Sequence, residues 1–454
     1  MNHLVDQYFD SLSDKKVAVL GIGVSNRPLI RMLLARGIHV LACDKTPREK
    51  LDAEVLELEQ AGAVLHVGEG YLDDVRADVV FRTPGMRPDV PELLEAKAHG
   101  AVITSEMEAF FAVCPCPILG VTGSDGKTTT ASVIAELLKA EGRRVWLGGN
   151  IGRPLLADAE QMTPDDLAVL ELSSFQLMDM PYSPQVAVLT NLAPNHLDVH
   201  KDMAEYVQAK KNVFEYQNET GKVVLNYDND ITRGFAADAK GTVEFFSRLA
   251  RPENGVYLED GVIYRNGKKI MAAADIRIPG VHNIENYMAA ACAVEGLAED
   301  EDIDEIARTF AGVEHRIEFV RELDGVKYYN DSIASSPSRT IAGLHSFRQK
   351  LVLIAGGYDK KIPFDALGPE ICAHVRLLIL CGATAEKIEA AVKAAPDYRP
   401  GEPEILHAQT LAEAVQLAKT HTVPGDIVTL SPACAAFDPF KNFMVRGETY
   451  KTLV

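Results

Sequence analysis

The stretch ILGVTGSDGKTTT, residues 118–130, decides how the centre of this chain folds. Residues 118–120 have the apolar character of a buried strand, and a helical pattern begins at Lys127. A glycine-rich turn between a strand and a helix directs backbone N–H groups and the helix N-terminus at phosphate oxygens. Lys127 would reach the terminal phosphates, and the hydroxyl of Thr128 or Thr129 would bind Mg²⁺. The stretch therefore predicts an ATP site.

This loop departs from the generic P-loop at one position. The generic pattern has a glycine five residues before the glycine of the Gly-Lys pair, where this chain has Val121; its glycines are Gly120 and Gly123. A glycine-rich turn without a ligand is the alternative. The strand, the Gly-Lys-Thr-Thr sequence and the helix occur together, which favours ATP binding. The loop residues expected to bind ATP are Gly123, Ser124, Asp125, Gly126, Lys127, Thr128 and Thr129.

Length and composition narrow the class of protein. A chain of 454 residues exceeds the ~250–300 residues of one hydrophobic core, so two or three domains are expected. A net charge of -19 argues against non-specific nucleic-acid binding. Seven scattered cysteines without a CxxC pair suggest neither a disulfide framework nor a zinc site, and Cys114 and Cys116 are interpreted as a domain junction. The N-terminus has no apolar signal core, and no apolar run is long enough to cross a bilayer, so we expect a cytoplasmic protein without membrane insertion.

Strand and helix patterns alternate along the chain, which predicts an α/β fold with parallel, wound sheets. Strands are predicted at residues 16–21, 39–44, 78–81, 118–120, 167–172, 185–189, 327–329, 351–354, 377–380 and 427–430, and helices at 27–36, 49–61, 203–215, 282–297 and 303–310. Residues 255–270 carry two turn signals and predict a small antiparallel insertion. We predict three domains: a Rossmann-like domain over 1–113, a P-loop ATPase-like domain over 114–313 and a Rossmann-like domain over 314–454.

A second glycine loop follows the first predicted strand. Gly21 and Gly23 resemble a dinucleotide fingerprint, but Asn26 replaces the third glycine, and Asp44 ends the next strand. One interpretation is a tight turn of a wound fold. The other is a nucleotide-diphosphate site over which residues 83–85 could close.

Three charged or polar features follow the ATP loop. Glu171 ends an apolar strand, where a carboxylate can hold Mg²⁺, although a solvated strand end is the alternative. His196 and His200 are four residues apart, a spacing found both on plain surfaces and at metal sites. Lys210 lies on a predicted amphipathic helix and taken alone is a solvated lysine.

Taken together, these motifs resemble the Mur ligases, a family that also includes the folylpolyglutamate synthetases. The similar segments are residues 122–128, 148–152 and 171–176, the segment around His196, and residues 282–283, 315–316 and 330–332, in the family's order over nearly the whole chain. The family spaces its loop glycines as this chain does, which removes the discrepancy at Val121.

The resemblance implies an ATP-dependent amide ligase that works through an acyl phosphate. Residues 330–335 and 430–438, with 441–443 following, point to the member that adds D-glutamate to UDP-N-acetylmuramoyl-L-alanine in peptidoglycan precursor synthesis. The dinucleotide-like N-terminal segment also fits that member. We expect a monomer. Because Lys127 and Asp331 lie in different predicted domains yet would serve one ATP, we also predict that the C-terminal domain moves when ATP binds.

The resemblance assigns roles to individual residues. ATP would bind the loop together with Asn283, Arg316 and Asp331. Two Mg²⁺ ions would be held by Thr128, Thr129, Glu171, His196 and a carbamylated Lys210, and the catalytic group would comprise Lys127, Glu171, His196 and Lys210. The UDP-sugar would bind Gly21, Gly23, Val24, Ser25, Asp44, Thr83, Pro84, Gly85 and Asn150. D-glutamate would bind Ser335, Lys360, Phe437 and Phe443.

Three positions depart from the family's pattern. Asn195 replaces an acidic residue before the histidine, Ile333 replaces a lysine of some members, and Ala436 replaces a serine that contacts D-glutamate in some members. Other interpretations stay open. The chain could be a sister ligase acting on folate or another muropeptide, or a P-loop binding protein that hydrolyses ATP slowly. The interpretation as an NAD-dependent dehydrogenase depends on Gly21 and Gly23 alone.

Overall fold

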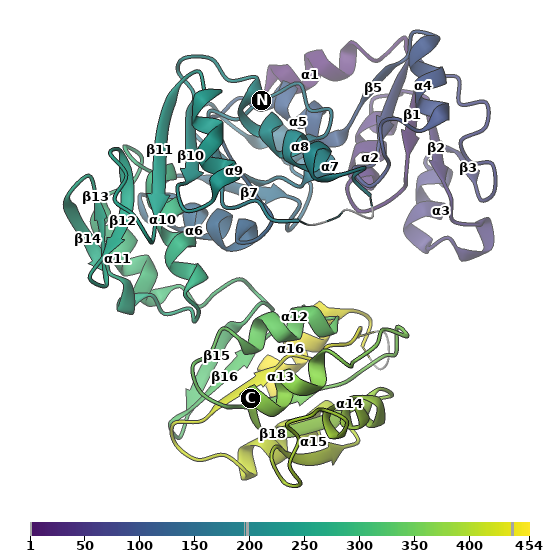
Figure 1. Ribbon diagram of the computed structural model, residues 1–454. Helices are drawn as coiled ribbons and strands as arrows, with labels where there is room; N and C mark the ends of the chain where they lie inside the picture. Colours follow the sequence, from purple (N-terminus) through teal and green to yellow (C-terminus); the bar gives the residue numbers. More distant parts are fainter. Residues whose placement is uncertain (1, 195, 197–198, 437–439) are drawn as a thin grey trace. The chain divides into compact units, whose positions relative to one another are not determined.

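The computed structural model describes residues 2–194, 196, 199–436 and 440–454 (Figure 1). The chain forms two compact units: Met1–Ala273 with Glu285–Ile306, and Ala274–Ile284 with Ala307–Val454. The first unit contains two β-sheets and the second contains a third sheet. The predicted α/β fold class is confirmed, whereas the domain boundaries after residues 113 and 313 stay predictions.

The first sheet is parallel throughout, with strand order β3-β2-β1-β4-β5. Its strands are β1 (Val17–Leu20), β2 (Val40–Asp44), β3 (Val64–Val67), β4 (Val79–Arg82) and β5 (Val102–Thr104), and the helices of this segment are α1 (His3–Asp10), α2 (Asn26–Ala35), α3 (Ala53–Gln60), α4 (Pro91–Ala98) and α5 (Glu106–Val113). Val17 and Val19 pack into one hydrophobic cluster, and Ala18 and Leu20 pack into another. Both faces of the sheet are therefore buried, as in Rossmann-type folds with this strand order.

The second sheet has the order β14-β13-β12-β11-β10-β9-β6-β8-β7. Its strands are β6 (Ile118–Thr122), β7 (Val145–Gly149), β8 (Leu167–Glu171), β9 (Val186–Leu189), β10 (Lys222–Asn226), β11 (Thr242–Ser247), β12 (Gly255–Glu259), β13 (Val262–Arg265) and β14 (Lys268–Ala272); the helices are α6 (Lys127–Ala140), α7 (Ser174–Leu177), α8 (Met203–Glu215), α9 (Asp230–Gly234), α10 (His282–Ala293) and α11 (Asp300–Thr309). Because β6 lies between β8 and β9, the C-terminal ends of these three parallel strands meet at one edge.

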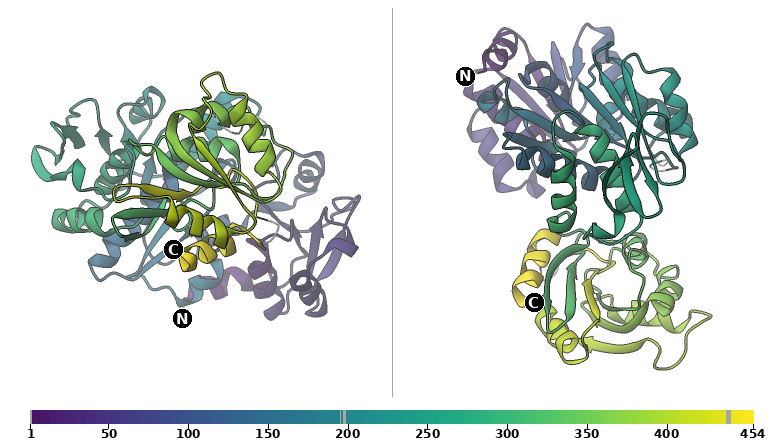
Figure 2. Two further views of the ribbon diagram at one scale, coloured as in Figure 1. Left: turned by 90° about the horizontal axis from the view of Figure 1, so that it is seen from below. Right: turned by 90° about the vertical axis from the view of Figure 1, so that its left-hand side faces the viewer.

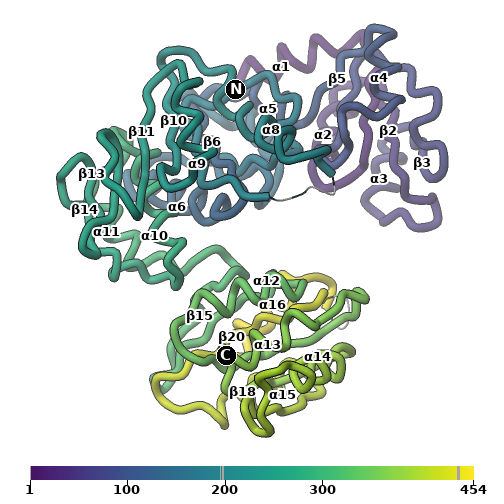
Figure 3. Tube along the Cα trace, in the orientation of Figure 1, coloured from purple at the N-terminus to yellow at the C-terminus, as the bar shows by residue number. Residues whose placement is uncertain are grey.

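The predicted antiparallel insertion is confirmed at the far edge of this sheet, beyond β11 (Figure 3). Asp260 and Gly261 connect β12 to β13, and Asn266 and Gly267 connect β13 to β14. All four residues have positive φ angles between 47° and 88°. Two-residue hairpin turns favour this left-handed backbone, which Asn, Asp and Gly adopt most readily.

The third sheet has the order β15-β16-β20-β17-β18-β19 and is parallel except for β15. Its elements are β15 (Glu318–Leu323), β16 (Val326–Asn330), α12 (Pro337–Leu344), β17 (Leu351–Ala355), α13 (Leu367–His374), β18 (Val375–Cys381), α14 (Ala385–Lys393), β19 (Glu404–Ala408), α15 (Leu411–Thr420), β20 (Ile427–Leu430) and α16 (Phe443–Leu453). Alternate residues of β17 enter two different clusters, Leu351 and Leu353 on one face and Val352 and Ile354 on the other. Helices cover both faces accordingly (Figure 2).

Some predicted boundaries were wrong. The helix predicted over residues 49–61 starts at Ala53, because the Asp52 side chain accepts a hydrogen bond from the Val55 N–H and caps it there. The helix predicted over 282–297 ends at Ala293. Strands β3, β5, β7, β10, β11, β15 and β19 were not predicted. Short or partly exposed strands such as β3 and β5 bury too few residues to give a clear apolar pattern.

One hydrophobic cluster runs through both sheets of the first unit. It includes Phe9 and Phe110 beside the first sheet and Leu170 and Tyr206 beside the second. Among the described residues, no helix is both long and apolar enough to span a membrane.

Candidate active site

The phosphate loop connects β6 to α6, as predicted, and its backbone is tightly enclosed. Gly123 and Gly126 have φ angles of +144° and +80°, where side chains are strained. A Cβ atom on Gly123 would lie 2.0 Å from Thr190 Oγ1, and one on Gly126 would lie 2.3 Å from Asn286 Oδ1. Asn191 adds support, since its Oδ1 accepts from the Asp125 N–H at 3.0 Å. Both glycines are therefore required by the shape of the loop.

Lys127 closes the loop on itself. Its Nζ donates to the carbonyl oxygens of Gly123 (3.0 Å) and Ser124 (2.9 Å). The ammonium is thus held over the turn whose N–H groups and helix N-terminus suit phosphate oxygens.

Glu171 ends β8 and is 2% exposed, so its interpretation as a solvated strand end was wrong. Its Oε2 accepts a hydrogen bond from Thr128 Oγ1 (2.6 Å), and its Oε1 accepts one from Asn150 Nδ2 (2.8 Å). Thr128 rather than Thr129 therefore faces this carboxylate. The group of hydroxyl and carboxylate oxygens at the start of α6 is the kind of ligand set that Mg²⁺ prefers. Asn150 thus contacts Glu171 through its side-chain amide, and its predicted role in binding a UDP-sugar stays a prediction.

Lys210 is 2% exposed, so its interpretation as a solvated lysine was also wrong. It projects from α8, and its Nζ donates to Thr122 Oγ1 at 3.0 Å. Burial lowers the pKa of Lys210 well below its usual range, and the positive charge of Lys127 lowers it further, against the opposing effect of Glu171. This lysine therefore loses its proton far more readily than a surface lysine.

Both histidine rings lie against the ring of Phe175. Phe175 is 5.1 Å from the His196 ring and 5.4 Å from the His200 ring between centroids, and it stacks on His200 at 8°. His200 is buried, its Nε2 bonds Ser174 Oγ at 2.9 Å, and burial lowers its pKa. His200 Nε2 is therefore engaged by Ser174, whereas His196 has an exposed side chain and a positive φ of 54°; a metal role of His196 stays a prediction. Asn195 lies outside the described residues.

The side chains of Asp44, at the end of β2, and Asn26 hold the backbone of the first glycine loop. Asp44 accepts hydrogen bonds from the N–H groups of Ile22 (2.7 Å) and Thr46 (2.9 Å). Burial raises the pKa of Asp44, but these hydrogen bonds outweigh it and leave the pKa below its usual range. Asn26, at the position of the third glycine, donates from Nδ2 to Gly21 O at 2.8 Å.

Thr83 packs directly against this loop. A Cβ on Gly21, whose φ is +89°, would lie 2.8 Å from Thr83 Cβ. The structure thus places Thr83 beside Gly21, and closure of residues 83–85 over a ligand stays a prediction. Val24 is 74% exposed beside them.

The predicted adenosine residues Asn283, Arg316 and Asp331 all belong to the second unit, whereas Lys127 belongs to the first. Asp331 is buried; its Oδ2 accepts from Ser431 Oγ at 2.7 Å, and burial raises its pKa to about 7. Asn283 is buried and donates to Pro279 O at 2.6 Å, and Arg316 is exposed.

The residues predicted to bind D-glutamate follow strands of the third sheet. Ser335 precedes α12, Lys360 follows β17 and is exposed, and Phe443 begins α16. The Phe443 carbonyl accepts from Ser332 Oγ at 2.8 Å. Phe437 lies outside the described residues. Ile333 and Ala436 are partly buried and buried, respectively.

Two domains of one protein family together match most of this chain. The Mur ligase middle domain matches residues 121–294, and the Mur ligase glutamate ligase domain matches residues 315–434. The chain belongs to the Mur ligase family. A protein of Acetivibrio thermocellus named UDP-N-acetylmuramoylalanine–D-glutamate ligase is 52% identical over 461 residues, covering 100% of this chain and 99% of its own length. A protein of the same name from Clostridium botulinum is 51% identical, covering 99% of this chain and 98% of its own.

Solved structures show the same fold at lower identity. The UDP-N-acetylmuramate-alanine ligase of Thermotoga maritima has a TM-score of 0.57 and 17% identity, covering 96% of this chain and 98% of its own. This likeness supports the Mur ligase fold alone.

Two arginines of this Mur ligase, the buried Arg446 and the partly buried Arg87, escaped the sequence analysis. Arg446 donates to Ser332 O (2.8 Å) and Cys434 O (3.1 Å), and burial lowers its pKa to about 10. Arg87 donates to Val199 O (2.6 Å) and Glu205 (2.8 Å), and so joins the segment after residues 83–85 to the start of α8. Arg446 reaches Ser332 and Arg87 reaches Val199 and Glu205, each more than 110 positions away in the sequence, and no local pattern signals such contacts.

Proposed function

We propose that this chain is an ATP-dependent ligase that joins D-glutamate to UDP-N-acetylmuramoyl-L-alanine and releases ADP and phosphate, in peptidoglycan precursor synthesis. The observation that carries the proposal is identity of 51–52% to relatives named for this reaction, over essentially the full length of both chains. The buried group of Thr128, Glu171 and Lys210 beside the phosphate loop supports it, because nucleotide binding alone does not need all three.

The chemistry explains why such a group is useful. A carboxylate and an amine do not condense at neutral pH, because oxide is a poor leaving group. Transfer of the γ-phosphoryl group to the L-alanine carboxylate gives an acyl phosphate, from which the D-glutamate amine displaces phosphate. Such a transfer depends mainly on positioning and on neutralising charge. Lys127 and the N–H groups of residues 123–126 would orient the terminal phosphates.

Magnesium fits the residues present. Thr128 and Glu171 would hold one ion through oxygen atoms, and His196 and Lys210 would hold a second. Bound Mg²⁺ would offset the negative charge that ATP and a substrate carboxylate bring together. Lys210 would contribute as a carbamate: its lowered pKa favours the neutral amine, which adds CO₂ and releases one proton. The carbamate then supplies oxygen atoms that the amine lacks.

The remaining assignments are part of the same proposal. The loop around Gly21 with Thr83, Pro84 and Gly85 would bind the UDP moiety, a role that fits backbone N–H groups better than side-chain charge. Asn283, Arg316 and Asp331 would bind adenosine, and Ser335, Lys360, Phe437 and Phe443 would surround D-glutamate. We expect a monomer that acts in the cytoplasm.

The test is phosphate release from Mg-ATP with UDP-N-acetylmuramoyl-L-alanine and one amine per reaction: D-glutamate, L-glutamate, L-lysine, meso-diaminopimelate or D-alanyl-D-alanine. Release with D-glutamate alone is the expected result. Release with another amine would move the assignment to a sister ligase. Release that needs neither acceptor nor amine would identify a slow nucleotide hydrolase instead.

A further inference from the structure

Two histidines and a glutamate lie close together in the second unit, and none of them has a role in the proposed reaction. His345 caps the C-terminal end of α12, and Glu370 and His374 lie on α13. Residues four apart on a helix share one face, so α13 presents both side chains toward the end of α12. The three ligand atoms all lie within 4.8 Å of one another.

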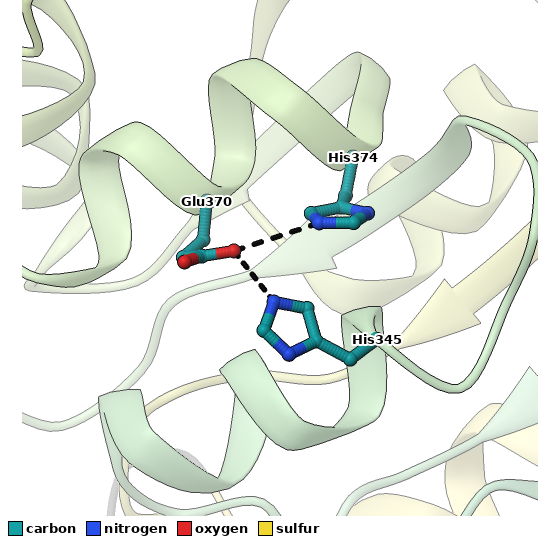
Figure 4. Close-up of side chains that lie close together, drawn as sticks. All are labelled: His345, Glu370 and His374. Atoms are coloured by element: carbon teal, nitrogen blue, oxygen red, sulfur yellow. Dashed lines mark hydrogen bonds and ion pairs between the residues drawn. The ribbon is translucent and has the colours of Figure 1, made fainter. Parts of the chain in front are cut away.

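Both imidazoles point at one carboxylate oxygen (Figure 4). His345 Nε2 lies 2.6 Å from Glu370 Oε2, and His374 Nε2 lies 3.5 Å from the same atom. The two rings are 4.9 Å apart between centroids and are tilted by 54°, so they approach without stacking face to face. In the described part of the chain, the ion pairs of Glu370 are with these two histidines only.

We propose that His345, Glu370 and His374 bind one Zn²⁺ ion. Two imidazole nitrogens and one carboxylate oxygen form a frequent zinc ligand set, with ligand–metal distances of roughly 2.0–2.2 Å. Ligand atoms around a tetrahedral ion of that size lie about 3.3 Å apart. The His374–Glu370 separation of 3.5 Å already matches, and the His345–Glu370 separation of 2.6 Å needs a small rotation of one side chain to open it.

Other histidine–carboxylate contacts of the chain fit a metal less well. His315 lies near Glu314 and Glu448, but the Lys451 ammonium already occupies both carboxylates, at 2.8 Å and 2.7 Å. The His407–Glu389 contact of 2.7 Å brings one imidazole, and Lys393 shares that carboxylate. The three-residue cluster is therefore the better-supported metal site.

The place of the cluster indicates a structural rather than a catalytic role. His374 immediately precedes β18, and His345 lies before β17, so the cluster is at the N-terminal ends of these strands. Ser335 lies at the other end of α12, about 15 Å of helical rise from His345. Lys360 follows the C-terminal end of β17. A bound ion would fasten α12 to α13 and stabilise the folded second unit, because it binds the native arrangement and not the unfolded chain.

The experiment is equilibrium dialysis of the full-length, metal-free protein against Zn²⁺ in excess Mg²⁺, which competes for the oxygen-rich ATP site. Wild type is expected to bind one more equivalent than His345→Ala or His374→Ala. His407→Ala is the matched control, since it removes an exposed histidine bonded to a glutamate, and it should keep the wild-type count. Equal counts in wild type and the two cluster variants would overturn the proposal.

A second measurement covers the case in which an alanine variant folds poorly. Glu370→Gln keeps the shape of the side chain and removes its charge. Zn²⁺ should raise the thermal unfolding midpoint of wild type and His407→Ala, but not that of Glu370→Gln. Co²⁺ should give a visible absorption band in the first two proteins alone. A midpoint shift and a band of wild-type size in Glu370→Gln would contradict the site. Both readouts are independent of ligase activity.

Discussion

The two glycine loops of the first unit start alike and end differently. Each follows a buried parallel strand and opens a helix, β1 to α2 in one case and β6 to α6 in the other. Around the second loop, neighbouring elements deliver a buried carboxylate at Glu171 and a buried amine at Lys210. Around the first, the carboxylate of Asp44 accepts hydrogen bonds from the N–H groups of Ile22 in the loop and of Thr46 after β2. The difference supports the proposal that the first loop would bind a ligand, whereas the second would also support chemistry.

The largest effect is expected from Lys127→Ala. Removing the ammonium that lies over the loop should reduce kcat by about 10³-fold, as loss of one preorganised charge donor in an enclosed site does. Steady-state phosphate release would measure it. Lys139→Ala, on the exposed side of the same helix and paired with Glu136, is the control and should keep wild-type activity. A tenfold or smaller loss in Lys127→Ala would show that the loop does not govern the chemistry.

The second largest effect is expected from Lys210→Ala. The variant is expected to lose about 10²-fold or more in kcat and to be insensitive to bicarbonate, while wild type depleted of CO₂ regains activity when bicarbonate is added. Its neighbour Lys211, paired with Glu215 and Asp238, provides the control Lys211→Ala. If bicarbonate stimulated both variants equally, the result would contradict a carbamate on Lys210.

Substitutions of two glycines in the first loop can distinguish an effect on substrate binding from an effect on the chemical step. Gly21→Ala places a Cβ 2.8 Å from Thr83 at a φ of +89°, so we expect a KM for the UDP-sugar raised about tenfold with little change in kcat. Gly23→Ala meets no protein atom within 4 Å and should leave the free energy of unfolding nearly unchanged, so any rise in its KM would come from the ligand. A fall in kcat at constant KM for Gly21→Ala would mean that this loop takes part in the reaction.

The smallest effect is a pH-dependent one at Asp44. Its pKa is lowered in the folded state, so the stabilisation is present above the ordinary value of about 4 and is lost as the pH falls through the folded-state pKa. Asp44→Asn should cost about 1 kcal/mol at pH 7, since the amide oxygen keeps one of the two hydrogen bonds. Urea unfolding at several pH values would measure it. A difference from wild type that stays constant down to pH 3 would contradict this origin.

Much of the fold could be predicted because strand and helix patterns are local. The helix over residues 203–215 was predicted with the bounds of α8, and the hairpin turns at Asp260 and Asn266 follow directly from residue type. The phosphate loop was predicted for the same reason, since its strand, glycines and lysine are consecutive. The resemblance to the Mur ligases then assigned roles to Glu171 and Lys210. Taken alone, each of these residues had been interpreted as solvated.

Contacts across long separations could not be predicted. Lys210 becomes a buried amine because α8 lies against β6, 88 residues earlier at Thr122. Arg446 is buried by carbonyl groups of residues 332 and 434, and His345 meets Glu370 only because α12 and α13 pack together. A charged residue read from sequence alone is assigned to solvent by default, since burial of its charge depends on partners that no local pattern specifies.

The most direct test of the central claim follows oxygen during the reaction. UDP-N-acetylmuramoyl-L-alanine labelled with ¹⁸O at both oxygens of the L-alanine carboxylate would be converted with D-glutamate and Mg-ATP, and the released phosphate would be analysed by mass spectrometry. Attack of the carboxylate on the γ-phosphorus predicts one ¹⁸O atom in each phosphate and one retained in the new amide. Phosphate without label would contradict an acyl phosphate, and with it the role of the phosphate loop in activating the carboxylate.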